Sequence, residues 1–165
     1  MTDRTTTEFA ALTRRFTDAV EAGDGAALAA LFTEDGTYYD YIFGPFSGRA
    51  AIAEMLEKHF FAGGRDFRWE MLDPVGDGTL GYAYYLFSFT STLPGAEGTR
   101  VAVDGMAQFR LRDGAIVEYR EVVNGGIPMV QLGHAPERMA KVLGRWSDRL
   151  LRDSPGLARH KAIGR

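Results

Sequence analysis

The stretch Asp35-Gly36-Thr37-Tyr38-Tyr39-Asp40-Tyr41-Ile42-Phe43-Gly44-Pro45-Phe46-Ser47-Gly48-Arg49 decides how the chain is interpreted. It leaves a helix, runs through a short strand, and passes a Gly/Pro loop before another helix begins. Alternation along that strand puts Tyr38, Asp40 and Ile42 on one face. An aspartate among aromatic side chains is a place where burial can tune a carboxyl group for proton transfer.

The composition is that of one ordinary globular domain spanning residues 1–165, with 45% hydrophobic and 25% charged residues. A formal net charge of −3 provides no basic field, so we expect neither a nucleic acid nor a membrane surface as partner. The chain has no cysteine, which excludes disulfides and thiolate metal sites and fits the cytoplasm. The sequence shows neither an apolar leader nor an apolar run of about 18 residues, so we expect a cytoplasmic protein.

The spacing of apolar residues predicts helices first and strands afterwards. Helices are expected over residues 7–22, in a short segment after Asp24, and over residues 49–61 and 136–151. Strands are expected over residues 37–43, 67–72, 79–92, 99–112 and 115–124. This order indicates an α+β fold with N-terminal helices packed on a curved antiparallel sheet, an extra C-terminal helix, and a frayed tail over residues 152–165.

Three segments carry a resemblance to a known fold family. They are Ala22-Gly23-Asp24 with the following residues Leu28 to Asp40, the helix start Gly48-Arg49-Ala50-Ala51-Ile52, and the strand pair from Gln108 to Tyr119. Over residues 8–125 the chain resembles the cone-shaped domain shared by ketosteroid isomerases, SnoaL-type polyketide cyclases and nuclear transport factor 2. The resemblance implies the fold, but this fold hosts many unrelated functions.

The resemblance to the ketosteroid isomerases implies a base without its usual partners. Asp40 falls, without a gap, where those enzymes carry their general base. Phe16 and Ala107 stand in the ligand pocket where the isomerases place the tyrosine and the protonated aspartic acid of the oxyanion hole. Losing one such donor typically costs about 2.7–4 kcal/mol, so steroid isomerisation is not the expected activity.

The resemblance to the SnoaL-type cyclases is better along the last strand. The segment Ile116 to Asn124 resembles the corresponding strand of that family, with Glu121 at its acidic position and Arg120 at its aromatic position. The segment Met129 to Gly133 resembles the part that follows. Cyclases of this type work with an acid–base carboxylate and without a metal or nucleotide, so the resemblance implies no cofactor.

Strand alternation and the resemblance together define a candidate site. The expected catalytic groups are Asp40 as the base, with Glu121 or His59 as the acid or relay. His59 lies on the helix that would cover the cavity mouth. The expected ligand-binding residues are Tyr38, Tyr119, Trp69, Tyr84, Tyr82, Phe16 and Ala107. The three histidines lie on separate elements without ligand spacing, so no metal site is predicted.

Each of these residues also has a plainer interpretation. Asp40 can be a strand-end aspartate that accepts hydrogen bonds from the amides of the following loop. Glu121 can be an exposed partner of Arg120 or Arg110, and His59 an ordinary helix histidine. The tyrosines are core residues by default, although buried hydroxyls need partners.

Two functions remain open from the sequence. The first is a pocket for a small apolar or cyclic molecule, in which carboxylates catalyse a cofactor-free isomerisation, cyclisation or dehydration. The alternative is a non-catalytic domain that binds an apolar ligand or dimerises. A homodimer is expected through the outer sheet face, with Tyr39, Tyr41 and the helix that carries Trp146 as the candidate contacts.

Overall fold

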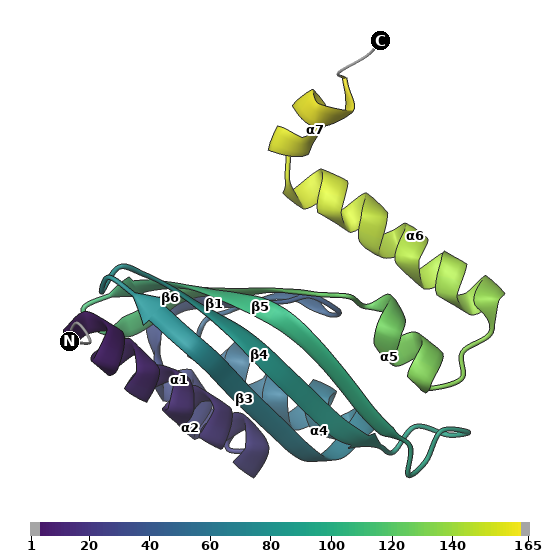
Figure 1. The fold of residues 1–165 in the computed structure, drawn as a ribbon, viewed down its shortest axis with the longest axis horizontal. Helices are drawn as coiled ribbons and strands as arrows, with labels where there is room; N and C mark the ends of the chain where they lie inside the picture. Colours follow the sequence, from purple (N-terminus) through teal and green to yellow (C-terminus); the bar gives the residue numbers. More distant parts are fainter. Residues whose placement is uncertain (1–3, 163–165) are drawn as a thin grey trace.

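The computed structural model describes residues 4–162 and has the expected α+β architecture (Figure 1). Its strands are β1 (Phe32–Asp40), β2 (Gly44–Ser47), β3 (Gly64–Gly76), β4 (Leu80–Ser91), β5 (Arg100–Arg112) and β6 (Ala115–Val123). Its helices are α1 (Arg4–Ala22), α2 (Gly25–Ala30), α3 (Arg49–Met55), the π-helical η1 (Leu56–Phe60), α4 (Phe61–Gly63), α5 (Gly126–Gln131), α6 (Pro136–Asp153) and α7 (Gly156–Lys161).

The strands form one curved sheet in the order β2-β1-β6-β5-β4-β3. Every neighbouring pair is antiparallel except β1 and β6, which run parallel. The helices α1 and α2 pack on one side of the sheet, whereas α6 and α7 project from the body (Figure 1). Because β1 lies beside the last strand, Asp40 and Glu121 become neighbours although 81 positions separate them.

The first helix is held on the sheet by an apolar stripe and by one carboxylate. Phe9, Phe16 and Val20 follow helical spacing on α1 and are buried. At the C-terminal end of α1, Glu21 accepts hydrogen bonds from the Trp69 backbone N–H at 2.7 Å and from the Arg68 guanidinium at 2.9 Å. These bonds fix α1 along β3.

An aromatic cluster fills the space between α1 and the sheet. The ring of Phe16 stacks on Tyr38 at 5.9 Å between centroids and lies 4.8 Å from Tyr119. Phe109 and Trp69 meet Phe16 edge-on, each at 5.5 Å. All five side chains are almost fully buried. This part of the cone is therefore a packed core rather than an open cavity.

Several element boundaries differ from the sequence prediction. The strand expected from residue 37 begins earlier, at Phe32, whose carbonyl oxygen accepts hydrogen bonds from the Arg49 guanidinium at 2.7 and 2.9 Å. The expected loop after β1 contains β2, which pairs with β1 as a hairpin. The short helix α5 was not expected, and α7 lies within the expected frayed tail.

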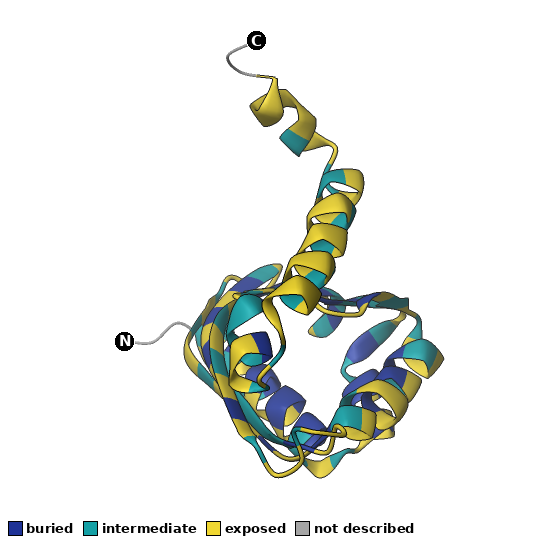
Figure 2. Cartoon of the chain, turned by 90° about the vertical axis from the view of Figure 1, so that its right-hand side faces the viewer, coloured by how far each residue is buried: buried dark blue, intermediate teal, exposed yellow. Residues whose placement is uncertain are grey.

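The C-terminal helix α6 leads away from the body and has no buried residue (Figure 2). Its Trp146 ring meets Tyr41 edge-on at 5.6 Å, and its Asp153 accepts a hydrogen bond from the Tyr39 hydroxyl at 2.5 Å. These contacts join α6 to Tyr39 on β1 and to Tyr41 in the turn that follows it. Among residues 4–162, no helix combines the length and hydropathy needed to cross a bilayer.

Candidate functional site

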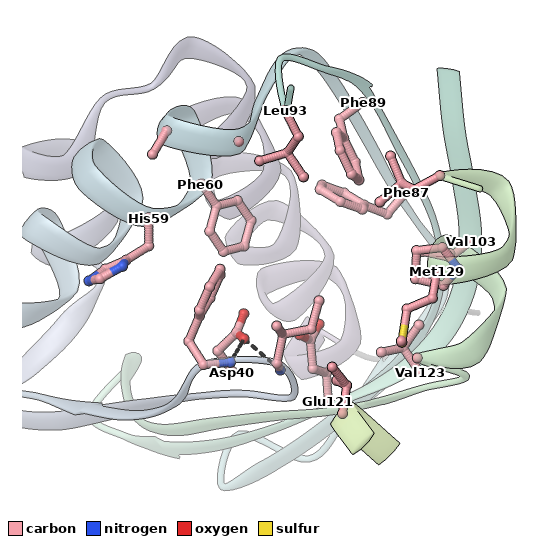
Figure 3. Close-up of a pocket in the computed structure, with 18 of the residues that line it drawn as sticks. Asp40, His59, Phe60, Phe87, Phe89, Leu93, Val103, Glu121, Val123 and Met129 are labelled. Atoms are coloured by element: carbon pink, nitrogen blue, oxygen red, sulfur yellow. Dashed lines mark hydrogen bonds between the residues drawn. The ribbon is translucent and has the colours of Figure 1, made fainter. Parts of the chain in front are cut away.

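A cavity of about 530 Å³ lies between the inner face of the sheet and the helices η1, α5 and α6 (Figure 3). Its size is that of a pocket for a small organic molecule. One part of the lining is aromatic, and another part consists of apolar side chains from α5 and α6, including Met129, Val142 and Trp146. The aromatic part consists of Phe60, Phe67, Trp69, Tyr85, Phe87 and Phe89. Two carboxylates, Asp40 and Glu121, also line the cavity.

Asp40 ends β1 and turns its carboxyl group into the cavity, where the residue is 3% exposed. Its Oδ1 accepts hydrogen bonds from the backbone N–H groups of Ile42 and Phe43, both at 2.7 Å (Figure 3). The plainer interpretation of Asp40 as an acceptor for loop amides is thus correct. Asp40 can still act in the cavity, because both amides bind Oδ1 and neither binds Oδ2.

Glu121 lies on β6 beside Asp40 and is held by tyrosine hydroxyls. Its Oε2 accepts hydrogen bonds from the hydroxyls of Tyr119 at 3.0 Å and Tyr85 at 3.1 Å. Its Oε1 accepts a longer bond from the Tyr41 backbone N–H at 3.4 Å. Glu121 is therefore not the exposed partner of an arginine; Glu118 pairs with Arg110 and Arg120 instead.

The two carboxyl groups hold protons differently from free carboxyls. Burial raises the pKa of Asp40 to about 6, against the lowering effect of the two loop amides. Burial, and then the negative charge of Asp40, raises the pKa of Glu121 to about 8, while the tyrosine hydroxyls lower it. The two carboxyls interact and titrate as a pair, and the surroundings raise the pKa of Glu121 more than that of Asp40.

Tyr85 was missed by sequence reasoning, and its position depends on a glycine. A Cβ at Gly105, which pairs with Tyr85 across β4 and β5, would lie 2.4 Å from the Tyr85 hydroxyl. The absence of that atom lets the ring cross β5 and reach Glu121. Burial raises the pKa of the Tyr85 hydroxyl, so Tyr85 keeps its proton and remains a donor. The sequence signal that could have found Tyr85 is strand alternation, which places Tyr85 on the same face of β4 as Phe87.

His59 lines the edge of the cavity and is exposed. Its imidazole lies against the rings of Phe43 and Phe46, both at 5.4 Å between centroids. In Figure 3 it stands apart from the two carboxylates. Its charge lowers the pKa of Asp40 only as the smallest of the contributions. This geometry favours Glu121 over His59 as the acid.

The expected ligand-binding set needs correction. Tyr38, Tyr119, Phe16 and Ala107 face inward but are buried in the aromatic core and do not line the cavity. Aromatic packing fills the space that a ligand would need beside them. Among them, Tyr119 acts on the site indirectly, because its hydroxyl donates a hydrogen bond to Glu121.

Tyr82 and Tyr84 lie on the outer face of the sheet and are each 38% exposed. Tyr84 donates to Asp104, and Tyr82 accepts from Gln108. The prediction that they line the cavity is wrong because side chains on β4 alternate, and Ala83 occupies the inner face between them.

Trp69 is the expected lining residue that does reach the cavity. Its indole Nε1 is buried without a hydrogen-bond partner among residues 4–162. Within the same described residues, no three His, Cys, Asp or Glu side chains come together in a way that could hold a metal ion.

The fold and the cavity define a small-molecule-binding protein of the α+β cone class. The SnoaL-like domain family matches residues 13–119, more than half of the chain. The chain therefore belongs to the SnoaL-like domain family.

Solved structures share this fold. A hypothetical protein of ketosteroid isomerase-like fold from Catenulispora acidiphila, in complex with trimethylamine, is 21% identical with a TM-score of 0.68 and covers 75% of this chain and 93% of its own. A proposed polyketide cyclase from Xanthomonas campestris is 25% identical with a TM-score of 0.65, covering 77% and 98%. An LEH-like epoxide hydrolase from M. tuberculosis is 19% identical with a TM-score of 0.63, covering 77% and 90%. Comparison with curated proteins gives no match.

Proposed function

We propose that this protein catalyses cofactor-free proton transfer on a small cyclic or polyketide-like molecule, as an isomerase, cyclase or dehydratase. The observation that carries the proposal is the pair of neighbouring carboxyl groups in one apolar cavity, whose pKa values are raised unequally. Titratable groups whose environments separate their pKa values divide the acid and base roles. Asp40 is the base and Glu121 the acid.

The step begins at a C–H bond next to a substrate carbonyl. Both loop amides bind Oδ1 of Asp40, so we assign Oδ2 to accept the proton. As the C–H electron pair forms a carbon–carbon double bond, the carbonyl oxygen gains negative charge and takes the Glu121 proton. In an isomerisation, protonated Asp40 gives its proton to another carbon while the enol hydroxyl returns its proton to Glu121. In a cyclisation, the enol carbon attacks a second carbonyl, whose oxygen takes the proton from Asp40, while the enol hydroxyl returns its proton to Glu121. A general base of this kind contributes typically about 10²–10⁴-fold.

Deuterium exchange tests the proposal without knowledge of the native substrate. Wild-type protein, Asp40→Asn and Glu121→Gln are incubated with 2-tetralone and related bicyclic ketones in D₂O, and deuterium at the α-carbon is measured by mass spectrometry. We expect wild-type acceleration, a loss of about 100-fold or more in Asp40→Asn, and a smaller loss in Glu121→Gln. Asp148→Asn, an exposed carboxylate on α6, is the matched control and keeps the wild-type rate. Equal rates in wild type and Asp40→Asn contradict the proposal.

A second candidate is a non-catalytic binder of an apolar ligand. It is favoured by the hydrogen bonds that the site already satisfies, because Asp40 and Glu121 each accept at least two from the protein itself. Under this alternative the same ketones bind, as measured by quenching of the fluorescence of Trp69 and Trp146, which both line the cavity, and α-carbon exchange stays at the rate of Asp40→Asn. We propose the cytoplasm as its location, since the chain has no cysteine.

The proposed partner in solution is a second copy of the chain, docked on the outer sheet face. Leu72, Tyr84, Met106 and Val122 form one cross-strand row over β3, β4, β5 and β6, and all four are exposed. A contiguous apolar row of this kind is typical of an interaction surface. Tyr39, Tyr41 and Trp146, expected in the interface, instead contact partners within the chain.

A further inference from the structure

Arg149, on the C-terminal helix α6, reaches the loop that carries the candidate base. Its Nη1 donates to the carbonyl oxygen of Ile42 at 2.9 Å, and its Nη2 donates to the carbonyl oxygen of Tyr41. The guanidinium therefore binds two successive carbonyls immediately after β1. Arg149 lies beyond residue 119, where the match to the SnoaL-like family ends.

The same two peptide groups bind Asp40 from their other side. The Tyr41 carbonyl and the Ile42 N–H belong to one peptide, and the Ile42 carbonyl and the Phe43 N–H belong to the next. Both N–H groups donate to Oδ1 of Asp40 at 2.7 Å (Figure 3). Two peptide groups thus connect a guanidinium at one end to a carboxylate at the other.

This arrangement has an electrostatic consequence. A hydrogen bond from a cation to a peptide oxygen polarises the peptide and strengthens the bond that its N–H makes. Each N–H of the loop then stabilises the ionised carboxylate more than the neutral acid. A charged donor also holds the loop conformation on which the alignment of both amides depends.

We propose that Arg149 is a positioning residue for Asp40, which orients the loop of residues 41–43 and stabilises the ionised carboxylate through its two peptide groups. The helix that supplies Arg149 is fixed nearby, because the Trp146 ring lies over Gly125, where a Cβ would come within 2.2 Å of it. The extension beyond the family domain is therefore part of the site. Only its catalytic consequence rests on the proposed function.

Other charged groups act on the same carboxyl. Glu121 on β6 faces it and shares its titration, and His59 on η1 lowers its pKa slightly. The hydroxyls of Tyr38 and Tyr85 remain protonated because burial raises their pKa values. Arg149 is the larger of the two cationic contributions. Removal of the Arg149 charge therefore shifts the proton equilibrium of Asp40 toward the protonated acid.

The test is a carboxyl titration of Asp40 by carbon-detected NMR in the full chain. In Arg149→Gln we expect the Asp40 pKa to rise by about one pH unit, roughly a tenfold change in proton affinity. The amide protons of Ile42 and Phe43 exchange faster. Arg145→Gln removes a charge one turn earlier on the same exposed helix and leaves the Asp40 pKa unchanged.

Arg149→Lys separates the electrostatic role from a merely structural one. It keeps the positive charge but not the forked donor geometry, so we expect an Asp40 pKa between wild type and Arg149→Gln. Thermal unfolding and circular dichroism establish that each variant is folded. If Arg149→Gln does not fold, the lysine variant decides. An Asp40 pKa that stays at the wild-type value in the folded variants overturns the proposal.

The outcome is distinguishable from that of the proposed function. A shifted Asp40 pKa in a protein without α-carbon exchange keeps the positioning role and removes the enzymatic proposal. An unshifted pKa in a protein whose exchange depends on Asp40 removes the positioning role alone.

Discussion

Asp40 on β1 and Glu121 on β6 lie side by side and face the same cavity. Tyr39 on β1 pairs with Arg120 on β6, and the two carboxylates are the next residues on these parallel strands. Two like charges in an apolar site raise each other's proton affinity. The relationship makes the pair, rather than either residue alone, the chemical unit of the site.

Asp40→Asn should lower the pKa of Glu121. The negative charge of Asp40 is the second cause of the raised Glu121 pKa, after burial, and asparagine removes that charge without removing the side chain. NMR titration of the Glu121 carboxyl measures the change, with Asp148→Asn as the control. A Glu121 pKa that is the same in Asp40→Asn as in the wild type would mean that the two carboxyls do not interact.

The free energy of unfolding should fall as pH rises through the range in which the pair ionises. Both carboxyls have raised pKa values in the folded protein, so the folded state binds more protons than the unfolded state between about pH 4 and pH 8. Their contribution therefore favours the folded state at the acidic end and is lost toward the alkaline end. Urea unfolding across this range should show the slope, and Asp40→Asn/Glu121→Gln should remove most of it. An unchanged slope in the double variant would contradict the assignment.

Gly105→Ala should destabilise the protein by about 1–3 kcal/mol, because the new Cβ overlaps the Tyr85 ring. Displacing Tyr85 also removes a hydrogen bond that lowers the Glu121 pKa, so that pKa should rise further. Urea unfolding and carboxyl titration measure the two effects. Gly144→Ala in α6, where the added Cβ meets no atom within 4 Å, is the matched control and should not destabilise.

Tyr119→Phe and Tyr38→Phe should differ although the two rings lie 4.5 Å apart in the same core. The Tyr119 hydroxyl donates to Glu121, and its loss should cost about 1 kcal/mol and raise the Glu121 pKa. Among residues 4–162 the Tyr38 hydroxyl makes no hydrogen bond to Glu121, so its removal should change stability and the Glu121 pKa less than removal of the Tyr119 hydroxyl does. Equal effects of the two substitutions in urea unfolding and titration would contradict this distinction.

Met106→Lys/Val122→Lys should convert the proposed dimer into a monomer without affecting the cavity. Both side chains are exposed on the outer sheet face, and Val122 is 69% exposed in the single chain. Charges placed within an apolar interface repel across the two-fold axis. Light scattering at micromolar concentration measures the mass, and Arg145→Gln on α6 is the control. A monomeric wild type would contradict the dimer.

Local patterns were sufficient for the order of elements and for the inward direction of the Asp40 side chain. Helical spacing predicted α1 and α6, and the Arg112-Asp113-Gly114 turn predicted the β5–β6 hairpin. Alternation placed Asp40 on the inner face with Tyr38. These features depend on neighbours in sequence, which is why periodicity reveals them. Boundaries that depend on distant contacts, such as the start of β1 at Phe32 beneath Arg49, were not predicted.

The sequence by itself determined the α+β fold and an aspartate among the tyrosines of its first strand. Only the tertiary structure decided which side chains share the cavity with that aspartate. Register between β4 and β5 brings Tyr85 to Glu121 and sends Tyr84 outward, and packing of α6 brings Arg149 to the loop after Asp40. The reason is physical: a strand's inner face is set by its pairing partners, and the placement of α6 by contacts between residues more than 100 positions apart.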